Sequence, residues 1–330
     1  MNKEIAALWE IHKEDLLCTA AERYGLDRNT LEPLGGFESY VIRSENLVLK
    51  ITHNIRRSKE YLLGELEFVQ YLAQNGVAVA APVPSMQSNL VETIALEDGY
   101  FLIYAFQKAK GAEPDENELD AVFFEQWGRL TGQIHALTKQ FQPSQPAYKR
   151  QEWCEEDVLD YEKYVPAHQQ IVHQKKEKIF RLIHSLPKYC DCYGLTHNDI
   201  HYGNIFLADG RLTIFDFDDC TYHWFINDIA IAIHSVLPGY DQEAQFNQIT
   251  EQFLTHFLKG YFQENQLDPI WFGYLSDFLR LYDLINYGVF YQAWDMNTLH
   301  PTIRKTLERV RHRIENEICI VGTEFEKFSS

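Results

Sequence analysis

The sequence has few cysteines, and their spacing excludes the common zinc sites. Its 330 residues include six cysteines, and only Cys190 and Cys192 are close together. No pair has the Cys-x-x-Cys spacing that structural zinc sites use. The sparse pattern fits free thiols in a reducing compartment.

Long apolar runs are also missing. Residues 1–17 carry charges throughout, so they lack the uninterrupted apolar core of a secretory signal. The most apolar stretch, 229–237, is nine residues long and contains His234. A helix needs about 20 apolar residues to cross a bilayer. We therefore expect a cytoplasmic protein that makes no contact with a membrane.

Basic residues are outnumbered. Lys and Arg total 30 against 48 Asp and Glu, which gives a formal net charge of −18. Such a surface repels nucleic-acid phosphates and anionic lipid, so we expect no nucleic-acid partner. It suits a cationic ligand, although a negative balance most often serves solubility. Hydrophobic residues make up 45% of the chain, which excludes global disorder.

The character of the chain changes after about one hundred residues. The first part alternates helical and strand-like segments, expected at 1–30, 40–43, 47–51, 58–75, 91–94 and 100–104. Helical patterns dominate the rest, at 119–139, 155–186, 240–263, 268–295 and 301–318, interrupted by one strand-like island at 195–217. The sequence therefore predicts an α+β fold with two lobes, residues 1–105 and 106–330.

The strand-like island contains a hairpin with polar groups at both outer ends. Asp209-Gly210 is the turn signal. Because a hairpin brings its outer ends together, Asp199, Asn204 and Asp216 should converge. One carboxylate and one amide oxygen suit Mg²⁺, which keeps water and phosphate oxygens as its other ligands. Asp199, one loop away, is placed to accept a proton from an attacking hydroxyl.

The register of this hairpin gives a test. A two-residue loop pairs Asn204 with Phe215 and puts Asn204 and Asp216 on opposite faces. A three-residue loop, 208–210, pairs Asn204 with Ile214 and puts the two on one face. If both ligate one ion, we predict the three-residue loop, with Gly210 at positive φ. A two-residue loop counts against shared ligation unless the hairpin has a bulge or its ends leave the ladder.

The motif His197-x-Asp199-x4-Asn204, followed by the hairpin and Ile214-Phe215-Asp216-Phe217-Asp218, resembles the aminoglycoside phosphotransferase/choline kinase family. This family uses the protein-kinase-like fold on small molecules. The resemblance implies ATP or GTP with Mg²⁺ as cofactors, Asn204 and Asp216 as metal ligands, and Asp199 as the residue that orients or deprotonates a substrate hydroxyl.

The resemblance also assigns supporting positions. His197 would be structural, and Asp228 would cap a buried helix or tie down the catalytic loop. A packing role is expected for His135. Asp218 has two open roles, a second Mg²⁺ ligand or a brace for the loop, and His201 would face either the substrate or solvent.

The first lobe supplies the expected nucleotide-binding parts. Lys50 lies in an apolar strand and Glu65 on the apolar stripe of its helix, where an unpaired charge is costly. Pairing the two solves both problems, and in the family such a lysine contacts the α- and β-phosphates. By the same resemblance, Gly35-Gly36 would cover the phosphates. Backbone groups near Ala105 and Phe106 would bind adenine.

The acceptor side is less defined. Carboxylates at 113–120 and 152–162 form solvated faces or line a cleft for a cationic substrate. Aromatic residues of a late helix, Tyr287, Tyr291 and Trp294, recur at helical spacing, which more often marks a core than a cation site.

The predicted function is transfer of the γ-phosphate of ATP or GTP to a hydroxyl of a small molecule. The acceptors considered are an aminoglycoside, a choline-like amine, homoserine and a sugar derivative, and the protein is expected as a monomer or homodimer. A Ser/Thr protein kinase of the same fold and a non-catalytic nucleotide-binding scaffold are the alternatives. Against the first, Asp216-Phe217-Asp218 replaces Asp-Phe-Gly and no Ala-Pro-Glu segment follows. Against the second, the metal and base positions are filled.

Overall fold

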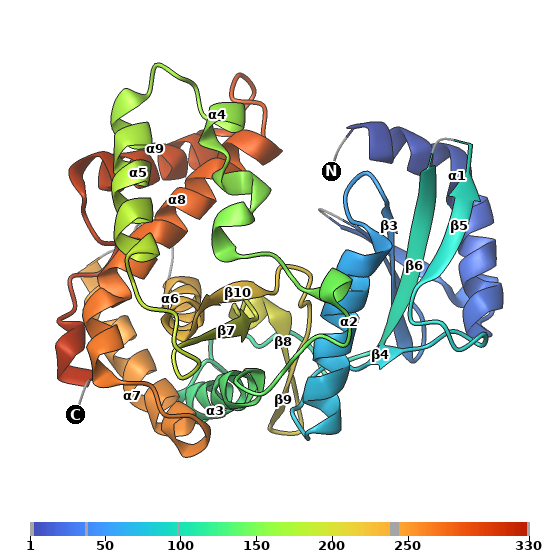
Figure 1. Cartoon of the computed structure of the whole chain (residues 1–330), viewed down its shortest axis with the longest axis horizontal. Coiled ribbons are helices and arrows are strands. Elements are labelled where there is room, and N and C mark those ends of the chain that lie inside the picture. Colours follow the sequence, from blue (N-terminus) through green and yellow to red (C-terminus); the bar gives the residue numbers. More distant parts are fainter. Residues whose placement is uncertain (1–2, 37–38, 98, 238–243, 329–330) are drawn as a thin grey trace.

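A computed structural model describes the whole chain except residues 1–2, 37–38, 98, 238–243 and 329–330 (Figure 1). A sheet with two long helices comes first in the chain, and a mostly helical lobe follows, as the predicted α+β class requires. All six cysteines are free thiols. Among the described residues, no helix is both long and apolar enough to cross a bilayer.

The first lobe is built on an antiparallel sheet in the order β1-β2-β3-β6-β4, with β5 also paired to β6. Its strands are β1 (Glu32–Gly35), β2 (Tyr40–Arg43), β3 (Leu47–His53), β4 (Pro82–Val83), β5 (Glu92–Leu96) and β6 (Gly99–Gln107). A tight turn at Glu45-Asn46 joins β2 to β3, in which the Ser44 N–H donates to the Leu47 carbonyl at 2.9 Å. Lys50 lies in β3, which forms the long central pair of the sheet with β6.

Two helices flank this sheet. Helix α1 (Lys3–Tyr24) covers one face, where Trp9 stacks on Tyr40 with ring centroids 3.7 Å apart. Helix α2 (Lys59–Gln74) begins at Ser58, whose hydroxyl accepts the N–H of Tyr61. One face of α2 packs on the sheet through Leu62 and Leu66. The other packs into the core of the second lobe, so α2 joins the two lobes.

The second lobe is mostly helical. Its helices are α3 (Ala121–Thr138), α4 (Tyr161–Tyr164), α5 (Gln170–His184), α6 (Phe225–Val236), α7 (Phe246–Glu264), α8 (Leu275–Ala293) and α9 (Pro301–Asn316). Short 3₁₀ turns of the chain are η1 (Arg28–Thr30), η2 (Pro146–Tyr148), η3 (Trp153–Glu155), η4 (Asp157–Leu159), η5 (Tyr202–Asn204), η7 (Pro269–Tyr274) and η8 (Phe325–Phe328). Helices α3 and α7 approach closely because Gly128 and Gly260 lie at the contact. A Cβ on either residue would lie 1.8 Å from a backbone oxygen of the other helix.

Two short sheets complete the second lobe, β7 (Tyr193–Thr196) with β10 (Thr221–Trp224) and β8 (Ile205–Ala208) with β9 (Arg211–Ile214). The single helix predicted over 155–186 is wrong, because that stretch contains η3, η4, α4 and α5. Pro166 ends α4, and Val165 before it is extended (φ −88°, ψ 128°), as a residue that precedes proline prefers.

Candidate active site

The β8–β9 hairpin has a two-residue turn, so the predicted three-residue loop is wrong. Ala208 pairs with Arg211, and both turn residues have positive φ, 50° at Asp209 and 72° at Gly210. The positive φ predicted for Gly210 is confirmed. The loop is shorter than expected because an aspartate tolerates the left-handed conformation, which completes the tight hairpin turn without a third residue.

One polar end of the hairpin leaves the ladder, which removes the objection to shared ligation. Asn204 ends the η5 turn, and its carbonyl still accepts the N–H of Phe215 at 3.0 Å, in the register of the two-residue turn. Asp216 has φ 66°, so the backbone turns away from the strand at this residue. The alternation of faces along a strand therefore does not extend to Asp216.

Neighbouring side chains hold one oxygen of the Asp199 carboxylate, Oδ2. The side-chain amide of Asn204 donates to the Asp199 carbonyl at 2.9 Å and to its Oδ2 at 3.0 Å. His201 Nε2 lies 3.5 Å from the same Oδ2. Among the described residues, Oδ1 accepts no hydrogen bond, and a third of the side chain is exposed. This leaves Oδ1 available to a substrate hydroxyl.

His197 is buried beneath this loop. Its Nε2 donates to the Phe215 carbonyl at 3.1 Å, and its Nδ1 accepts the N–H of Asp199 at 3.3 Å. Burial lowers the pKa of the ring, although Asp228 and Asp199 oppose the shift. A neutral ring with both nitrogens engaged supports the loop from below.

Asp228 connects the loop to α6. Its carboxylate accepts the N–H groups of His197 at 3.1 Å and Asn198 at 2.9 Å, and Nε2 of His135 at 3.0 Å. The other nitrogen of His135 faces the Tyr261 hydroxyl at 2.9 Å. Burial alone would raise the pKa of Asp228, but the His135 hydrogen bond holds it below its ordinary value. The loop is tied down by a buried, charged acceptor.

The expected ion pair between Lys50 and Glu65 does not form in this structure. Lys50 Nζ instead lies 2.5 Å from Asp216 Oδ1, so the pair bridges the two lobes. Burial would lower the pKa of Lys50, but the facing Asp216 raises it well above its usual value. Glu65 is fully buried, and neither of its oxygens has a hydrogen-bond partner. Burial and the nearby Asp218 raise its pKa from 4.5 to about 7.

Asp218 lies in a cluster of arginines. Arg56 Nη2 is 2.5 Å from its Oδ2, and Arg57 Nε is 3.9 Å from its Oδ1. Burial would raise the pKa of this carboxyl, but Arg56 and Arg57 hold it well below its usual range. Of its two expected roles, these contacts match the brace.

Arg150 is a residue that the sequence did not single out. It is 2% exposed, and its guanidinium lies 3.6 Å from the ring centroid of Tyr61 in α2. It donates to the carbonyls of Tyr61 (3.0 Å), Cys220 (2.8 Å) and Asp218. It therefore joins α2 to the segment that follows Asp216. Because all three acceptors are backbone oxygens, no pattern in the sequence predicts the contact.

The donor set at the hairpin ends fits a hard divalent ion. Asp216 offers a carboxylate that is 41% exposed. Asn204 uses its amide nitrogen on Asp199, which leaves the amide oxygen as its remaining ligand atom. Two protein oxygens suit an ion that takes its other ligands from phosphate and water.

The remaining nucleotide positions lie as follows. Gly35 ends β1 with φ 83° and Gly36 follows with φ 151°, in the turn that leads to β2; Phe37 and Glu38 of that turn lie outside the described residues. Ala105 and Phe106 lie inside the ladder, each paired with β3 on one side and β4 on the other. The first backbone outside the ladder is therefore 108–111, later than the two predicted positions. Gly111 (φ 85°) then passes so close to β8 that a Cβ would lie 1.9 Å from the Leu207 carbonyl.

Further carboxylates surround the free side of Asp199. Glu156, within the acidic stretch 152–162, accepts a hydrogen bond from Asn198 at 2.8 Å, and burial beside Asp219 raises its pKa to about 8. Tyr282 of α8 is close enough to Asp199, Asp219 and Glu156 that, after burial, these charges raise its pKa further. Burial and its neighbours likewise raise the pKa of Asp219 to about 7, and this carboxyl lies 3.6 Å from Arg57 Nη2. Of the late-helix aromatics, Tyr287 is buried and hydrogen-bonded to Gln169 at 2.5 Å, as a core residue would be.

Comparison with known proteins gives a consistent set of relatives. The sequence profile of the phosphotransferase enzyme family matches residues 30–274. The amicoumacin kinase of Bacillus subtilis (strain 168) is 41% identical over 334 residues, covering 98% of both chains.

Solved structures agree with the sequence match. An amicoumacin kinase in complex with AMP-PNP, Ca²⁺ and Ami superposes with a TM-score of 0.93, at 39% identity and 99% coverage of both chains. A microcompartment-associated aminopropanol kinase shares the fold, with a TM-score of 0.71 at 20% identity over 92% of this chain and 98% of that one.

Proposed function

The chain belongs to the phosphotransferase enzyme family and is an ATP-dependent small-molecule kinase, and we propose that its acceptor is a hydroxyl of amicoumacin or a close cationic analogue. The observation that carries the proposal is the similarity to amicoumacin kinases over nearly the whole chain, at about 40% sequence identity and with a TM-score of 0.93. The resemblance stated from the motif is confirmed at the level of the family.

In this proposal, each lobe binds one of the two substrates. Residues 1–105 with the linker at 108–111 hold the nucleotide, and the rest of the chain holds the acceptor. Lys50 moves from Asp216 to the nucleotide phosphates, where Glu65 orients it. Asn204 and Asp216 hold Mg²⁺, which neutralises charge on the phosphates during transfer.

Asp199 acts on the acceptor. Its Oδ1, the oxygen left free by Asn204 and His201, accepts the hydrogen bond of the attacking hydroxyl and then its proton. The bond from the acceptor oxygen to the γ-phosphorus forms as the bond to the ADP oxygen breaks. Positioning and charge neutralisation supply most of the rate enhancement in this chemistry.

The charge of the cleft supports a cationic acceptor. Asp199, Asp219 and Glu156 lie near one another and near Tyr282. An ammonium group placed among these carboxyls would favour their ionised forms and be stabilised by them.

Acceptor-dependent release of ADP tests the function. The assay compares amicoumacin with a panel of aminoglycosides, choline, ethanolamine and homoserine, using ATP or GTP with Mg²⁺, with Ca²⁺, or with a chelator. We expect turnover with amicoumacin, ATP and Mg²⁺, and a product heavier by one phosphoryl group. The matched control is Asp199→Asn.

Each outcome bears on the proposal. Turnover of amicoumacin that disappears in Asp199→Asn supports it. Turnover only with another acceptor of the panel retains the kinase and rejects the proposed acceptor. Activity that does not require a divalent ion rejects the roles proposed for Asn204 and Asp216.

A further inference from the structure

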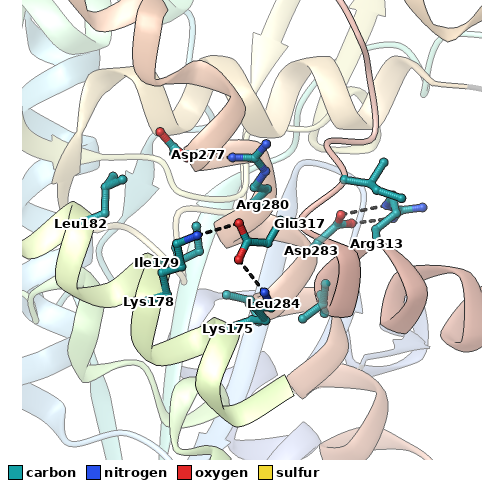
Figure 2. Close-up of a pocket in the computed structure, with 12 residues that line it drawn as sticks. Lys175, Lys178, Ile179, Leu182, Asp277, Arg280, Asp283, Leu284, Arg313 and Glu317 are labelled. Atoms are coloured by element: carbon teal, nitrogen blue, oxygen red, sulfur yellow. Dashed lines mark hydrogen bonds and ion pairs between the residues drawn. The ribbon is translucent and has the colours of Figure 1, made fainter. Parts of the chain in front are cut away.

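A cavity of about 410 Å³ lies among α5, α8 and α9 (Figure 2). Five of its twelve lining residues are aliphatic and seven are charged, and none of them belongs to the site described above. The apolar lining consists of Ile179, Leu182, Leu284, Ile314 and Ile318. A volume of several hundred Å³ is typical of sites for small molecules.

The two helices that frame this cavity are basic in a chain whose net charge is −18. Helix α5 carries four basic residues and one acidic residue, and α9 carries five basic and two acidic residues. Among the residues that line the cavity, four are basic and three are acidic, so the lining carries a small positive charge on an acidic protein. Such a region attracts anions.

The basic side chains that line the cavity differ in how completely they are paired with carboxylates. Lys175 and Lys178 both hold Glu317, at 2.5 Å and 2.6 Å. Arg313 forms two hydrogen bonds with the buried Asp283, at 2.8 Å and 2.5 Å. Figure 2 shows the Asp283–Arg313 pair to one side of the Glu317 pairs, with Arg280 above Glu317 in the view, next to Asp277.

Arg280 is the lining cation whose hydrogen-bond donors are only partly used. Its Nη1 donates to Asp277 at 3.0 Å, whereas its Nε is buried and has no hydrogen-bond partner among the described residues. Because Nε is enclosed by the protein, a ligand reaches the guanidinium through its terminal nitrogens, and no hydrogen bond of Nη2 is found among the described residues. A terminal guanidinium nitrogen donates a charge-assisted hydrogen bond to a carboxylate, sulfonate or phosphate oxygen.

We propose that this cavity is a binding site for a small amphipathic anion. The apolar body of the ligand packs against the five aliphatic side chains, and its single acidic group pairs with Arg280. The site is independent of the catalytic cleft. Arg280 and Tyr282 are two positions apart on α8, which puts them on opposite faces of that helix, and Tyr282 faces the carboxylates of the cleft.

Anilinonaphthalene sulfonate, an aromatic body with one sulfonate, is a suitable probe. The full chain is titrated with it in the presence of saturating Mg·AMP-PNP, and its fluorescence is followed. We expect a saturable signal with one site per chain that Mg·AMP-PNP does not displace. Inorganic sulfate, which has no apolar body, should compete only weakly. A signal that is absent, unsaturable or lost on addition of Mg·AMP-PNP overturns the proposal.

Variants locate the site. Arg280→Met keeps the side-chain volume but removes the guanidinium, and should weaken binding about tenfold or more, as expected for a hydrogen bond to a charged group. Arg280→Lys keeps the charge without the planar guanidinium and should give an intermediate loss. Ile318→Trp should fill the cavity and abolish the signal. Arg304→Met removes one charge from α9 outside the cavity, so binding should change less than about twofold.

Kinase activity serves as the folding control, because none of these residues belongs to the proposed catalytic machinery. Weakened binding in a variant that retains kinase activity supports the site. Unchanged probe binding in both Arg280→Met and Ile318→Trp would place the probe elsewhere and overturn the proposal.

Discussion

The catalytic loop and the Lys50–Asp216 region lie next to each other but are stabilised in different ways. In the loop, Asp228 holds the backbone N–H groups of His197 and Asn198, and Asn204 holds Asp199. The contacts that fix the shape of this loop are all made within the protein.

In the neighbouring region, the charged groups have partners that the proposed mechanism must replace. Lys50 holds the carboxylate that should bind the metal, and Glu65 has no hydrogen-bond partner. In the proposed mechanism, the acceptor-activating part is therefore prearranged, whereas the nucleotide-binding part is in a resting arrangement. A buried carboxylate without a partner is unfavourable, so we expect Glu65 to gain one when the nucleotide binds.

The largest expected effect is that of Asp199→Asn. The amide keeps the shape of the side chain and its contact with Asn204 but cannot accept the substrate proton, so kcat should fall about 10³-fold. The thermal midpoint should change little, because a third of the side chain is exposed. Retention of more than about a tenth of wild-type kcat would contradict the role of Asp199.

Lys50→Met should have the next largest effect, and it tests the Lys50–Asp216 ion pair. The substitution removes the cation proposed for the phosphates, so kcat/KM for ATP should fall about 10²-fold. The KM for the acceptor should remain near its wild-type value, because the catalytic loop does not depend on Lys50. A variant that raises only the acceptor KM would show that the two regions are coupled more tightly than the contacts indicate.

Glu65→Gln should change how stability depends on pH. The folded chain raises the pKa of Glu65 from 4.5 to about 7, so the folded state binds its proton more tightly than the unfolded state does. The resulting stabilisation is fully present below the unfolded pKa and is lost as the pH rises through the folded pKa.

Urea unfolding of the wild type and of Glu65→Gln, from about pH 5 to about pH 8, measures this linkage. The wild type should lose up to about 3 kcal/mol relative to the variant over that range. Glu60→Gln, an exposed carboxyl in the first turn of α2, is the matched control. Parallel pH profiles for wild type and Glu65→Gln would mean that Glu65 is charged throughout.

The smallest expected effect is that of Asp228→Asn, which weakens the prearranged loop. The amide can accept at one atom only, so the bonds to His197, Asn198 and His135 cannot all be kept. The free energy of unfolding should fall by about 2 kcal/mol, with a loss of kcat and an unchanged KM for ATP. Asp209→Asn in the exposed hairpin turn is the control, and an equal effect there would remove the special role of Asp228.

The sequence predicted the parts of this molecule that depend on local pattern. The apolar stripe of α2 and the paired strands β2 and β3 follow from spacing along the chain. The turn at 209–210 was expected one residue too long, because the left-handed preference of Asp209 was not weighed against the requirement for a shared face.

Contacts between distant segments were harder to predict. Lys50 has two buried or half-buried carboxylates within reach, and the choice of Asp216 over Glu65 depends on how the lobes pack. The hydrogen bonds of Arg150 all go to backbone carbonyls, so the sequence could not predict its partners. The family resemblance supplied Asp228 as a loop brace, but its bond to His135 depends on the packing of α3 against α6.

The central claim is that a prearranged catalytic loop lies beside a nucleotide site that rearranges on binding. The crystal structure of the complex with Mg·AMP-PNP tests this directly. We predict that the contacts of Asp228 and the Asn204–Asp199 hydrogen bonds stay as they are, while Lys50 leaves Asp216 for the phosphates and Asp216 binds the metal with Asn204. A complex in which Lys50 still holds Asp216, or in which the loop has rearranged around Asp199, would contradict the account.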